Sequence, residues 1–377
     1  MMTEFAVRAA AATPGDLGRL LGYTPRAQVA SLTMTTNTES WLRPLQIGPV
    51  TLGSNLVLSP MSGVTDSAFR RTVQAASGES VGLLVSEFIA VEGLTRANAR
   101  TMAMLRFIAS EKPISIQIFG ADVERMADAA RMVEEAGADI VDVNCGCPAP
   151  KVVRRGGGAQ LMRTPDLLRD ILRAIRRAVS IPFTVKIRSG WDDGSRNALD
   201  VARMVEDEGA AMLAVHGRTR LQQYRGLSDW DLVAEVRRRA AIPVIGSGDV
   251  FDAQAALARL QGGYADGVMI GRGAIANPWL FAQTQALAHG EAVAVPGAAE
   301  RVALLSFFRR ALDEAKEERA YLGRLRGLGC CLVKGFPGGA AARRALGAAR
   351  CADEVETVFR QFLLEGRRFD EALAEVA

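Results

Sequence analysis

Residues 142–162 read DVNCGCPAPKVVRRGGGAQLM and bring a cysteine, a basic pair and a glycine run into one connection. A run typical of a buried strand ends within this stretch, and residues 164–179 follow with a helical pattern that has Pro165 in its first turn. The stretch is therefore predicted to connect a strand to a helix. Cys147 lies just beyond the strand, and Pro148 restricts the backbone behind it, which indicates a side chain held in place.

Cys147 has three interpretations at this level. Most free cysteines are small buried apolar residues. Cys145 and Cys147 could share a metal, but two ligands one residue apart, without a histidine nearby, are not typical of a zinc or cluster site, so no metal is expected. The Gly-Cys-Pro context favours the third interpretation, a cysteine that transfers a proton or attacks a substrate at the end of a strand.

The composition is that of a globular protein. The chain has 377 residues, 49% of them hydrophobic, which suffices for one large domain and a small one. No apolar run of membrane-spanning length is free of charges, and residues 1–40 lack a secretory signal pattern and are expected to form a mobile extension. Five cysteines without a disulfide pattern favour the cytoplasm. We expect a monomer that does not contact membranes.

Short apolar runs alternate with amphipathic segments from Leu52 to about residue 288, which is the pattern of a parallel sheet. Eight such units fit an α/β fold of the (β/α)8 TIM barrel type over residues 41–292, with an open doubly wound sheet as the alternative. The expected strands are Asn55–Leu58, Gly82–Ser86, Ile114–Ile118, Ile140–Asn144, Phe183–Ile187, Met212–Val215, Pro243–Ile245 and Gly267–Ile270. Further helices are expected at 67–76, 121–136, 198–208, 229–239 and 252–260.

In a TIM barrel the ligand lies at the carboxyl ends of the strands. The seventh and eighth expected strands end in GSGD (246–249) and GRG (271–273). Glycine-rich turns before a helix offer backbone amides to a phosphate. These two turns therefore predict a phosphate site, with ordinary tight turns as the alternative.

Three polar side chains are expected to face the barrel mouth. Lys186 lies in the middle of an apolar strand, where a buried lysine must be paired or functional. His216 ends the sixth strand and is a better candidate for ligand contact than His289, which lies in a solvent-facing helical segment. Gln117 either contacts a ligand or satisfies a hydrogen bond in the core.

After Ala298 the strand pattern ends, and helical segments follow at 299–320, 321–333, 339–348 and 353–364. We assign residues 298–377 to a small all-helical domain near the barrel rim. Between positions 319 and 350 it carries no acidic residue and seven basic ones, Arg319, Arg324, Arg326, Lys334, Arg343, Arg344 and Arg350. Such a surface attracts polyanions, and a solvated helical face beside acidic neighbours is the equal alternative.

A series of motifs resembles the tRNA-dihydrouridine synthase family, most closely its bacterial B-type members, over about residues 45–362. Besides the 142–162 stretch they are LSPMSGVTDSAFR (58–70), PISIQIFG (113–120), VKIRSGW (185–191), VHGRTR (215–220), IPVIGSGDV (242–250), GRGAIANPWLF (271–281) and KGFPGGAAARR (334–344). The resemblance implies an FMN-binding barrel with a C-terminal helical tRNA-binding domain. Several motifs in this order make the resemblance specific.

The resemblance further implies the reduction of the C5=C6 bond of a tRNA uridine to dihydrouridine, at D-loop position 17 for B-type members. NADPH re-reduces the FMN, the reduced flavin delivers hydride to C6, and Cys147 protonates C5. The base has to flip out of the folded RNA to reach the barrel mouth. A flavin enzyme acting on a free pyrimidine, as dihydroorotate dehydrogenases do, and a silent tRNA-binding protein are the rival interpretations.

The resemblance also implies roles for individual residues. The flavin contacts are Pro60, Met61, Ser62, Gln117, Lys186 and His216 at the ring, and Ser247, Gly248, Asp249, Gly271 and Arg272 at the phosphate. Asn144 is expected to contact flavin or uracil. The expected tRNA contacts are the basic residues around the mouth and on the helical domain, namely Arg154, Arg155, Arg218, Arg220, Arg225, Arg343 and Arg344. Ser62, Cys145 and Ser247 depart from the usual residues of the family. Cys145 raises the question of which thiol is catalytic, and its context favours Cys147.

Overall fold

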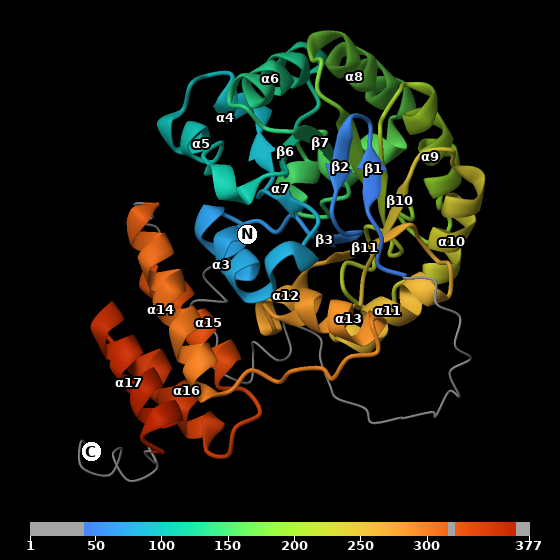
Figure 1. Ribbon diagram of the computed structural model, residues 1–377. Coiled ribbons are helices and arrows are strands. Elements are labelled where there is room, and N and C mark those ends of the chain that lie inside the picture. Colours follow the sequence, from blue (N-terminus) through green and yellow to red (C-terminus); the bar gives the residue numbers. More distant parts are fainter. Residues whose placement is uncertain (1–40, 316–320, 367–377) are drawn as a thin grey trace.

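A barrel of eight parallel strands forms the centre of the computed structural model, which describes residues 41–315 and 321–366 (Figure 1). The strands are β3 (Leu56–Leu58), β4 (Leu84–Val85), β6 (Ile114–Phe119), β7 (Ile140–Cys145), β8 (Phe183–Arg188), β9 (Leu213–His216), β10 (Val244–Ser247) and β11 (Gly267–Ile270). Each overlaps one of the eight predicted strands. The TIM barrel is therefore confirmed, and the open sheet is wrong.

The strands are hydrogen-bonded neighbours in the order β3-β11-β10-β9-β8-β7-β6-β4, and the ring closes between β3 and the start of β4. There the Leu58 N–H donates to the Leu83 carbonyl at 2.9 Å, and the Gly82 N–H donates to the Leu56 carbonyl at 2.8 Å. A two-residue strand β5 (Ile89–Ala90) also pairs with β6. Closure leaves no free sheet edge in the barrel.

A hairpin that the sequence pattern did not predict covers the amino-terminal end of the barrel (Figure 1). It consists of the antiparallel strands β1 (Leu45–Ile47) and β2 (Val50–Leu52), which are too short to show a clear alternation. The apolar cluster between hairpin and barrel contains Leu45, Ile47, Leu52, Val57, Leu83, Val85, Ile140, Met212, Ala214, Ile245 and Met269. This end of the interior is therefore largely apolar, whereas the network around Asp142 and the charged inner side chains lie toward the other end.

Helices surround the barrel, and four of them begin behind an aspartate. These are α3 (Ser67–Ser77), α6 (Val123–Glu135), α10 (Trp230–Arg239) and α11 (Ala253–Gln261), where Asp66, Asp122, Asp229 and Asp252 accept the N–H three residues later. Such caps satisfy one of the free amides at each helix start. The remaining elements of the shell are α4 (Val91–Leu94), α5 (Ala99–Ala103), α7 (Pro150–Val153), α8 (Pro165–Ala178), α9 (Ala198–Asp207), α12 (Arg272–Ala276) and α13 (Leu280–Ala288).

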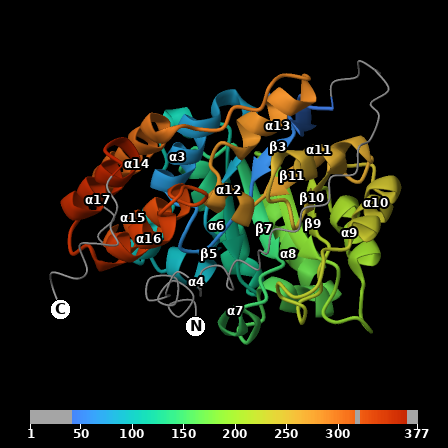
Figure 2. The same ribbon diagram turned by 90° about the horizontal axis from the view of Figure 1, so that it is seen from below.

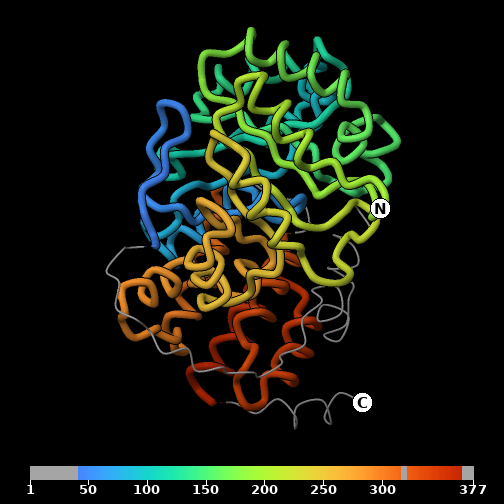
Figure 3. The backbone as a smooth tube through the Cα atoms, turned by 90° about the vertical axis from the view of Figure 1, so that its right-hand side faces the viewer, coloured from blue at the N-terminus to red at the C-terminus, as the bar shows by residue number. Residues whose placement is uncertain are grey.

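Four further helices form a bundle against one side of the barrel (Figures 1 and 3). They are α14 (Ala298–Glu314), α15 (Tyr321–Leu332), α16 (Gly339–Ala348) and α17 (Ala352–Leu364). Helix α14 packs on α3, and α15 packs on α12, so that the bundle shares one continuous apolar core with the barrel helices. Residues 1–40, 316–320 and 367–377, which include the expected extension and Arg319, lie outside the described residues.

Two ion pairs join the bundle to the barrel. Arg324 of α15 binds the carboxylate of Asp66, which also caps α3, and Arg71 of α3 binds Glu314 of α14 at 2.6 Å. Arg324 belongs to the basic stretch that was predicted as a polyanion surface. One of its charges is therefore neutralised within the protein. None of the helices in the described residues is both long and apolar enough to cross a membrane.

A fully buried ion pair stabilises the start of α3. Arg70 Nε donates to Glu111 Oε2 at 2.6 Å, and both side chains are almost completely excluded from solvent. Glu111 also accepts hydrogen bonds from the Ser67 hydroxyl and the Ile108 N–H. Removing one member of such a pair leaves an uncompensated buried charge.

We therefore expect Glu111→Ala to lower the free energy of unfolding by about 3–5 kcal/mol. Glu79→Ala, at an exposed position nearby, is the control and should change this free energy by less than about 0.5 kcal/mol. Urea denaturation followed by tryptophan fluorescence measures both variants. Equal unfolding midpoints for the two would contradict the assigned role of the buried pair.

Candidate active site at the barrel mouth

A chain of buried hydrogen bonds crosses the barrel interior from β8 to β6. Asp142 of β7 accepts the Thr184 hydroxyl and the Gln117 side-chain amide, both at 2.5 Å. Gln117 in turn accepts the Asn144 side-chain amide at 2.7 Å. All four side chains are buried, and burial raises the pKa of Asp142. Both polar groups of the Gln117 side chain therefore take part in buried hydrogen bonds, as one of its two interpretations predicted.

The same chain positions the loop that carries Cys147. The Asn144 side-chain oxygen accepts the N–H of Cys147 at 2.8 Å and the N–H of Gly146 at 3.1 Å. The Cys147 carbonyl accepts the Ala159 N–H at 3.1 Å, and Gly158 approaches so closely, with φ of +60°, that a Cβ there would overlap this carbonyl. The glycine run in the motif thus allows the loop to fold back on Cys147.

The Cys147 thiol lies in a small apolar cluster with Phe88 and Val152, with 9% of the residue exposed. Burial raises the pKa of this thiol, although Arg188 and Lys186 oppose the shift. It is therefore protonated at neutral pH, as a proton donor has to be. Cys145 points the other way, into the core between barrel and helices, and is completely buried. Geometry thus makes Cys147 the thiol available to a ligand.

Lys186 projects from β8 into the barrel interior near the carboxyl ends of the strands. It is half-buried and lies beside Asn144, its pairing partner on β7. No hydrogen bond joins its ammonium to another described residue, although Asp142 and Cys147 lie within electrostatic range. Burial is the main cause that lowers its pKa to about 8. A cation without a close counter-ion inside the mouth is suited to an electron-rich or anionic ligand.

His216 ends β9 in a neutral state. Burial, followed by the charges of Arg188 and Lys186, lowers its pKa well below the ordinary value. Its Nε2 lies 3.4 Å from Nη1 of Arg218, which can only donate, so this contact favours the tautomer with the proton on Nδ1. His289, by contrast, is half-exposed on the outside of the barrel.

Two buried arginines fix the loops around the mouth. Arg188 donates to the carbonyls of Gly146, Thr219 and Gln223, which ties the Cys147 loop to the loop after β9, and burial lowers its pKa to about 10. No sequence pattern indicated a role for Arg188. Its inward position follows from the two-residue period of β8, but its carbonyl partners could not be inferred from sequence.

Arg218 requires a correction. It was expected to contact tRNA phosphates, but only 2% of it is exposed, and its guanidinium binds both carboxylate oxygens of Asp249 at 2.7 and 2.8 Å. The charge of Arg218 is therefore compensated within the protein. Arg218 positions Asp249 and touches His216 rather than forming part of the outer surface.

The predicted phosphate turns lie side by side at the ends of β10 and β11. Asp249 has φ of +56°, and its carboxylate is held by Arg218, Arg272 and the Ser228 N–H. Arg272 stacks over Tyr224 and Phe251, with its guanidinium carbon 4.6 and 5.0 Å from the ring centroids. Both turns are half-buried at their tips, which leaves the backbone of Gly248 and Gly271 accessible.

The loop after β3 forms the adjoining wall. Pro60, Met61 and Ser62 are all half-buried, and a Cβ added at Gly271 would lie 3.4 Å from the Met61 sulfur. The Met61 N–H donates to the Thr65 hydroxyl at 2.9 Å, which fixes the loop before α3. The structure therefore brings the expected ring-contact residues of β3 next to the expected phosphate turn of β11.

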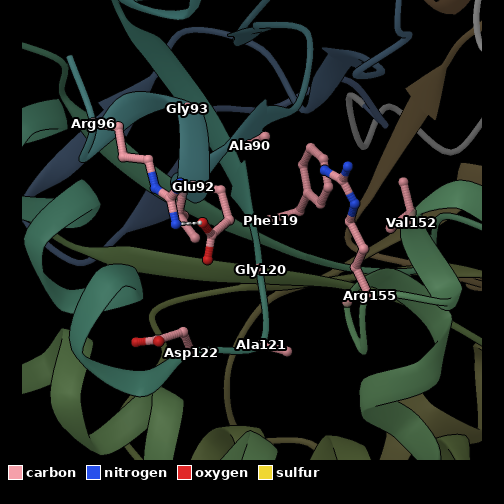
Figure 4. Close-up of a pocket in the computed structure, with 12 residues that line it drawn as sticks. Ala90, Glu92, Gly93, Arg96, Phe119, Gly120, Ala121, Asp122, Val152 and Arg155 are labelled. Carbon is pink, nitrogen blue, oxygen red and sulfur yellow. Dashed lines mark ion pairs between the residues drawn. The ribbon is translucent and has the colours of Figure 1, made fainter. Parts of the chain in front are cut away.

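A groove of about 690 Å³ lies beside the Cys147 loop (Figure 4). Phe119 and Val152 line it and also pack around Cys147. Arg155 extends toward the Phe119 ring, and the ion pair between Glu92 and Arg96 lies on the opposite side. Arg154 and Arg155 are exposed beside α7, which projects from this end of the barrel (Figure 2).

The basic residues of the helical bundle are only partly available to a ligand. Arg324 binds Asp66, and Arg326 donates to the Ala349 carbonyl. Arg343 is half-buried and Arg344 is exposed on α16. The pattern of charges along the sequence could not distinguish these groups, because their partners lie far away in the chain or on another helix.

Comparison with known proteins places this site in a family. The family model described as dihydrouridine synthase matches residues 57–365. The chain belongs to the dihydrouridine synthase family. The family assignment confirms the resemblance read from the motifs, which extend along the same part of the chain.

Individual relatives in this family match most of the chain. A Synechocystis protein named "Probable tRNA-dihydrouridine synthase 1" is 39% identical over 82% of this chain and 86% of its own length. "Probable tRNA-dihydrouridine synthase" of Mycobacterium tuberculosis is 40% identical over 83% of each chain. "tRNA-dihydrouridine synthase B" of Pseudomonas syringae is 41% identical over 64% of this chain and 71% of its own.

Solved structures confirm the fold alone. The structure of histamine dehydrogenase from Rhizobium sp. 4-9 has a TM-score of 0.52 at 13% identity and covers 72% of this chain and 51% of its own. The structure of 6-hydroxypseudooxynicotine amine oxidase from Pseudomonas geniculata has a TM-score of 0.50 at 18% identity. The match covers 71% of this chain and 52% of that protein.

The raised pKa of Cys147 has a measurable consequence in this family member. Only the thiolate reacts with iodoacetamide, so Cys147, whose pKa is raised by burial, should react slowly at about pH 7.5 and its rate should still increase at pH values where an ordinary cysteine is already ionised. Peptide mass spectrometry after timed alkylation follows each cysteine, with the exposed Cys351 as internal reference. A rate for Cys147 that levels off below about pH 8 would show that the thiol ionises too readily for a proton donor.

Proposed function

We propose that this chain is an FMN-dependent synthase that reduces the C5=C6 bond of a tRNA uridine to dihydrouridine with NADPH as the reductant. The observation that carries the proposal is the protonated Cys147 thiol, held by Asn144 at the mouth of a barrel whose charged inner side chains lie at that end. The names of the relatives support tRNA as the substrate. Position 17 of the D-loop is the uridine that the resemblance to B-type members implies.

The residues at the mouth fit a flavin mononucleotide. The backbone of Ser247, Gly248, Asp249 and Gly271 together with Arg272 would hold the phosphate, and the loop Pro60–Ser62 would lie along the ring. Lys186 has no hydrogen-bonding partner among the described residues, and its charge would stabilise an electron-rich ring. When bound, the flavin supplies the hydride that is added to C6 of the uracil.

Cys147 supplies the proton that completes the reduction. Its S–H bond breaks as the proton is added to C5, so that the base gains one hydride and one proton while NADPH is oxidised to NADP⁺. The neutral thiol meets the first requirement of a general acid. The Cys147 N–H donates to the Asn144 side chain and the Cys147 carbonyl accepts from the Ala159 N–H, and these bonds hold its backbone in place. Asn144, Gln117, Asp142 and Thr184 act together as positioning residues for this loop.

Cationic side chains around the mouth would bind the folded RNA. Arg154 and Arg155 lie exposed beside the Cys147 loop, and Arg343 and Arg344 belong to α16 of the bundle. Such contacts neutralise phosphates and orient the RNA without recognising sequence. The target base has to leave its stack to reach Cys147. The cytoplasm is the proposed compartment, because the five cysteines are free and tRNA is the substrate.

The test is anaerobic incubation of the purified protein with NADPH and unmodified tRNA, in parallel with free uridine and orotate. Mass spectrometry of nucleosides and of ribonuclease fragments should find two added hydrogens on one D-loop uridine and no change in the free pyrimidines. Turnover of a free pyrimidine alone would replace this proposal with a small-molecule flavin enzyme. Reduction at another uridine of the tRNA would support the proposed reaction and would correct only the assigned position 17.

Cys147→Ala should lower the rate of uridine reduction by about 10²–10⁴-fold, because it removes the thiol that donates the proton to C5. Flavin content and tRNA affinity should stay unchanged. Cys145→Ala is the matched control, two residues away but in the core between barrel and helices, and should retain activity. Single-turnover kinetics with pre-reduced enzyme measures both variants, and the opposite ranking would assign the proton to Cys145.

A further inference from the structure

Two arginines stack on one tryptophan at the rim of the barrel, beyond the end of β8. The guanidinium carbon of Arg163 lies 4.6 Å from the ring centroid of Trp191, and that of Arg220 lies 4.7 Å from it. Arg163 is exposed, whereas Trp191 and Arg220 are half-buried. We call Arg163, Trp191 and Arg220 the tryptophan cluster.

Backbone hydrogen bonds hold the tryptophan cluster in place. The Arg220 N–H donates to the Gly190 carbonyl at 2.9 Å, and the Leu221 N–H donates to the Trp191 carbonyl at 3.0 Å. These bonds join the loop after β8 to the loop after β9. Trp191 and Arg220 are thus positioned relative to each other before any ligand arrives, and this lowers the entropy cost of binding.

The positive charges of the cluster are not compensated within the described residues. Neither Arg163 nor Arg220 forms an ion pair with a described carboxylate, and Nε of Arg220 is buried without a hydrogen-bonding partner. The adjacent acids are engaged elsewhere, since Asp193 pairs with Arg196 and Asp192 accepts the Ser195 hydroxyl. Two cations close to one indole repel each other, and a bound anion would relieve this repulsion.

The loop after β9, which carries Arg220 near its start, also exposes apolar and aromatic side chains. Leu221, Tyr224 and Leu227 are exposed by 43%, 48% and 82% on the loop after β9. Exposed aromatic and apolar side chains interspersed with arginines are typical of surfaces that bind single-stranded nucleic acid, where bases stack and phosphates pair with guanidinium groups. A small anion would engage the arginines but not these three side chains.

We propose that the tryptophan cluster binds a backbone phosphate of the RNA strand that enters the barrel mouth, beside the reactive uridine. The inference rests on the proposed tRNA substrate and adds a contact on the barrel itself, remote in sequence from the basic bundle. Arg163 and Arg220 bind the phosphate oxygens, and Trp191 keeps both guanidinium groups in a fixed orientation. The phosphate groups of NADPH could bind the same two arginines, and the experiment distinguishes NADPH from RNA as the ligand.

The variant to test is Arg163→Gln, because Arg163 is exposed and its replacement leaves the core intact. Its control is Arg259→Gln, which removes an arginine stacked on Trp230 at 4.9 Å in the last turn of α11. We expect Arg163→Gln to weaken binding of unmodified tRNA about fivefold at about 100 mM salt and to reduce the slope of log K against log salt by about 0.7–0.9. The control should match the wild type in both quantities.

Three measurements on the flavin-loaded protein decide the outcome: tRNA affinity against salt concentration, the rate of flavin reduction by NADPH, and the single-turnover rate at saturating tRNA. The proposal expects only the first to change in Arg163→Gln. Unchanged tRNA affinity and an unchanged salt slope would overturn it. If, in addition, the flavin were reduced more slowly by NADPH, the tryptophan cluster would be assigned to NADPH binding instead. Absence of tRNA binding in the wild type would instead overturn the proposed function, and the inference with it.

Discussion

The buried carboxylate of Asp142 cannot lie inside the barrel without hydrogen-bond donors, because an unpaired charge there would be strongly destabilising. Thr184 and Gln117 supply those donors, and Gln117 then fixes the amide of Asn144. Asn144 in turn presents its oxygen to the N–H of Cys147. The need to satisfy the buried Asp142 carboxylate thus fixes the orientations of Gln117 and Asn144, and through Asn144 it positions the backbone of the Cys147 loop.

The two ends of the barrel differ because of what covers them. The β1–β2 hairpin covers one end and packs apolar side chains against the strands. At the other end Lys186, His216 and Arg188 project inward, where burial is the main cause that lowers all three pKa values, and the charge of Arg188 lowers those of Lys186 and His216 further. A concentration of positive charge at one end of the interior is suited to a phosphorylated, electron-rich cofactor and an anionic RNA substrate.

The helical bundle is linked to this site through the start of α3. Asp66 both caps α3 and binds Arg324 of α15, and α3 follows the loop of Pro60 to Ser62 at the mouth. The bundle and the mouth are therefore held at one fixed spacing by a continuous apolar core and by ion pairs. A folded RNA that touches both would be positioned by their relative placement as much as by any single contact.

Local sequence determined the eight strands, most helix boundaries and the position of Cys147 just beyond the end of a strand, because alternation, caps and the Gly-Cys-Pro turn act over a few residues. It also indicated Lys186 and His216 as inward-facing polar residues. Only the tertiary structure decided that Arg218 is neutralised by Asp249, that Arg324 binds Asp66, and that Arg163 and Arg220 meet on Trp191. These contacts join segments far apart in the chain or on separate loops, and periodicity along one segment carries no information about which distant segment it meets.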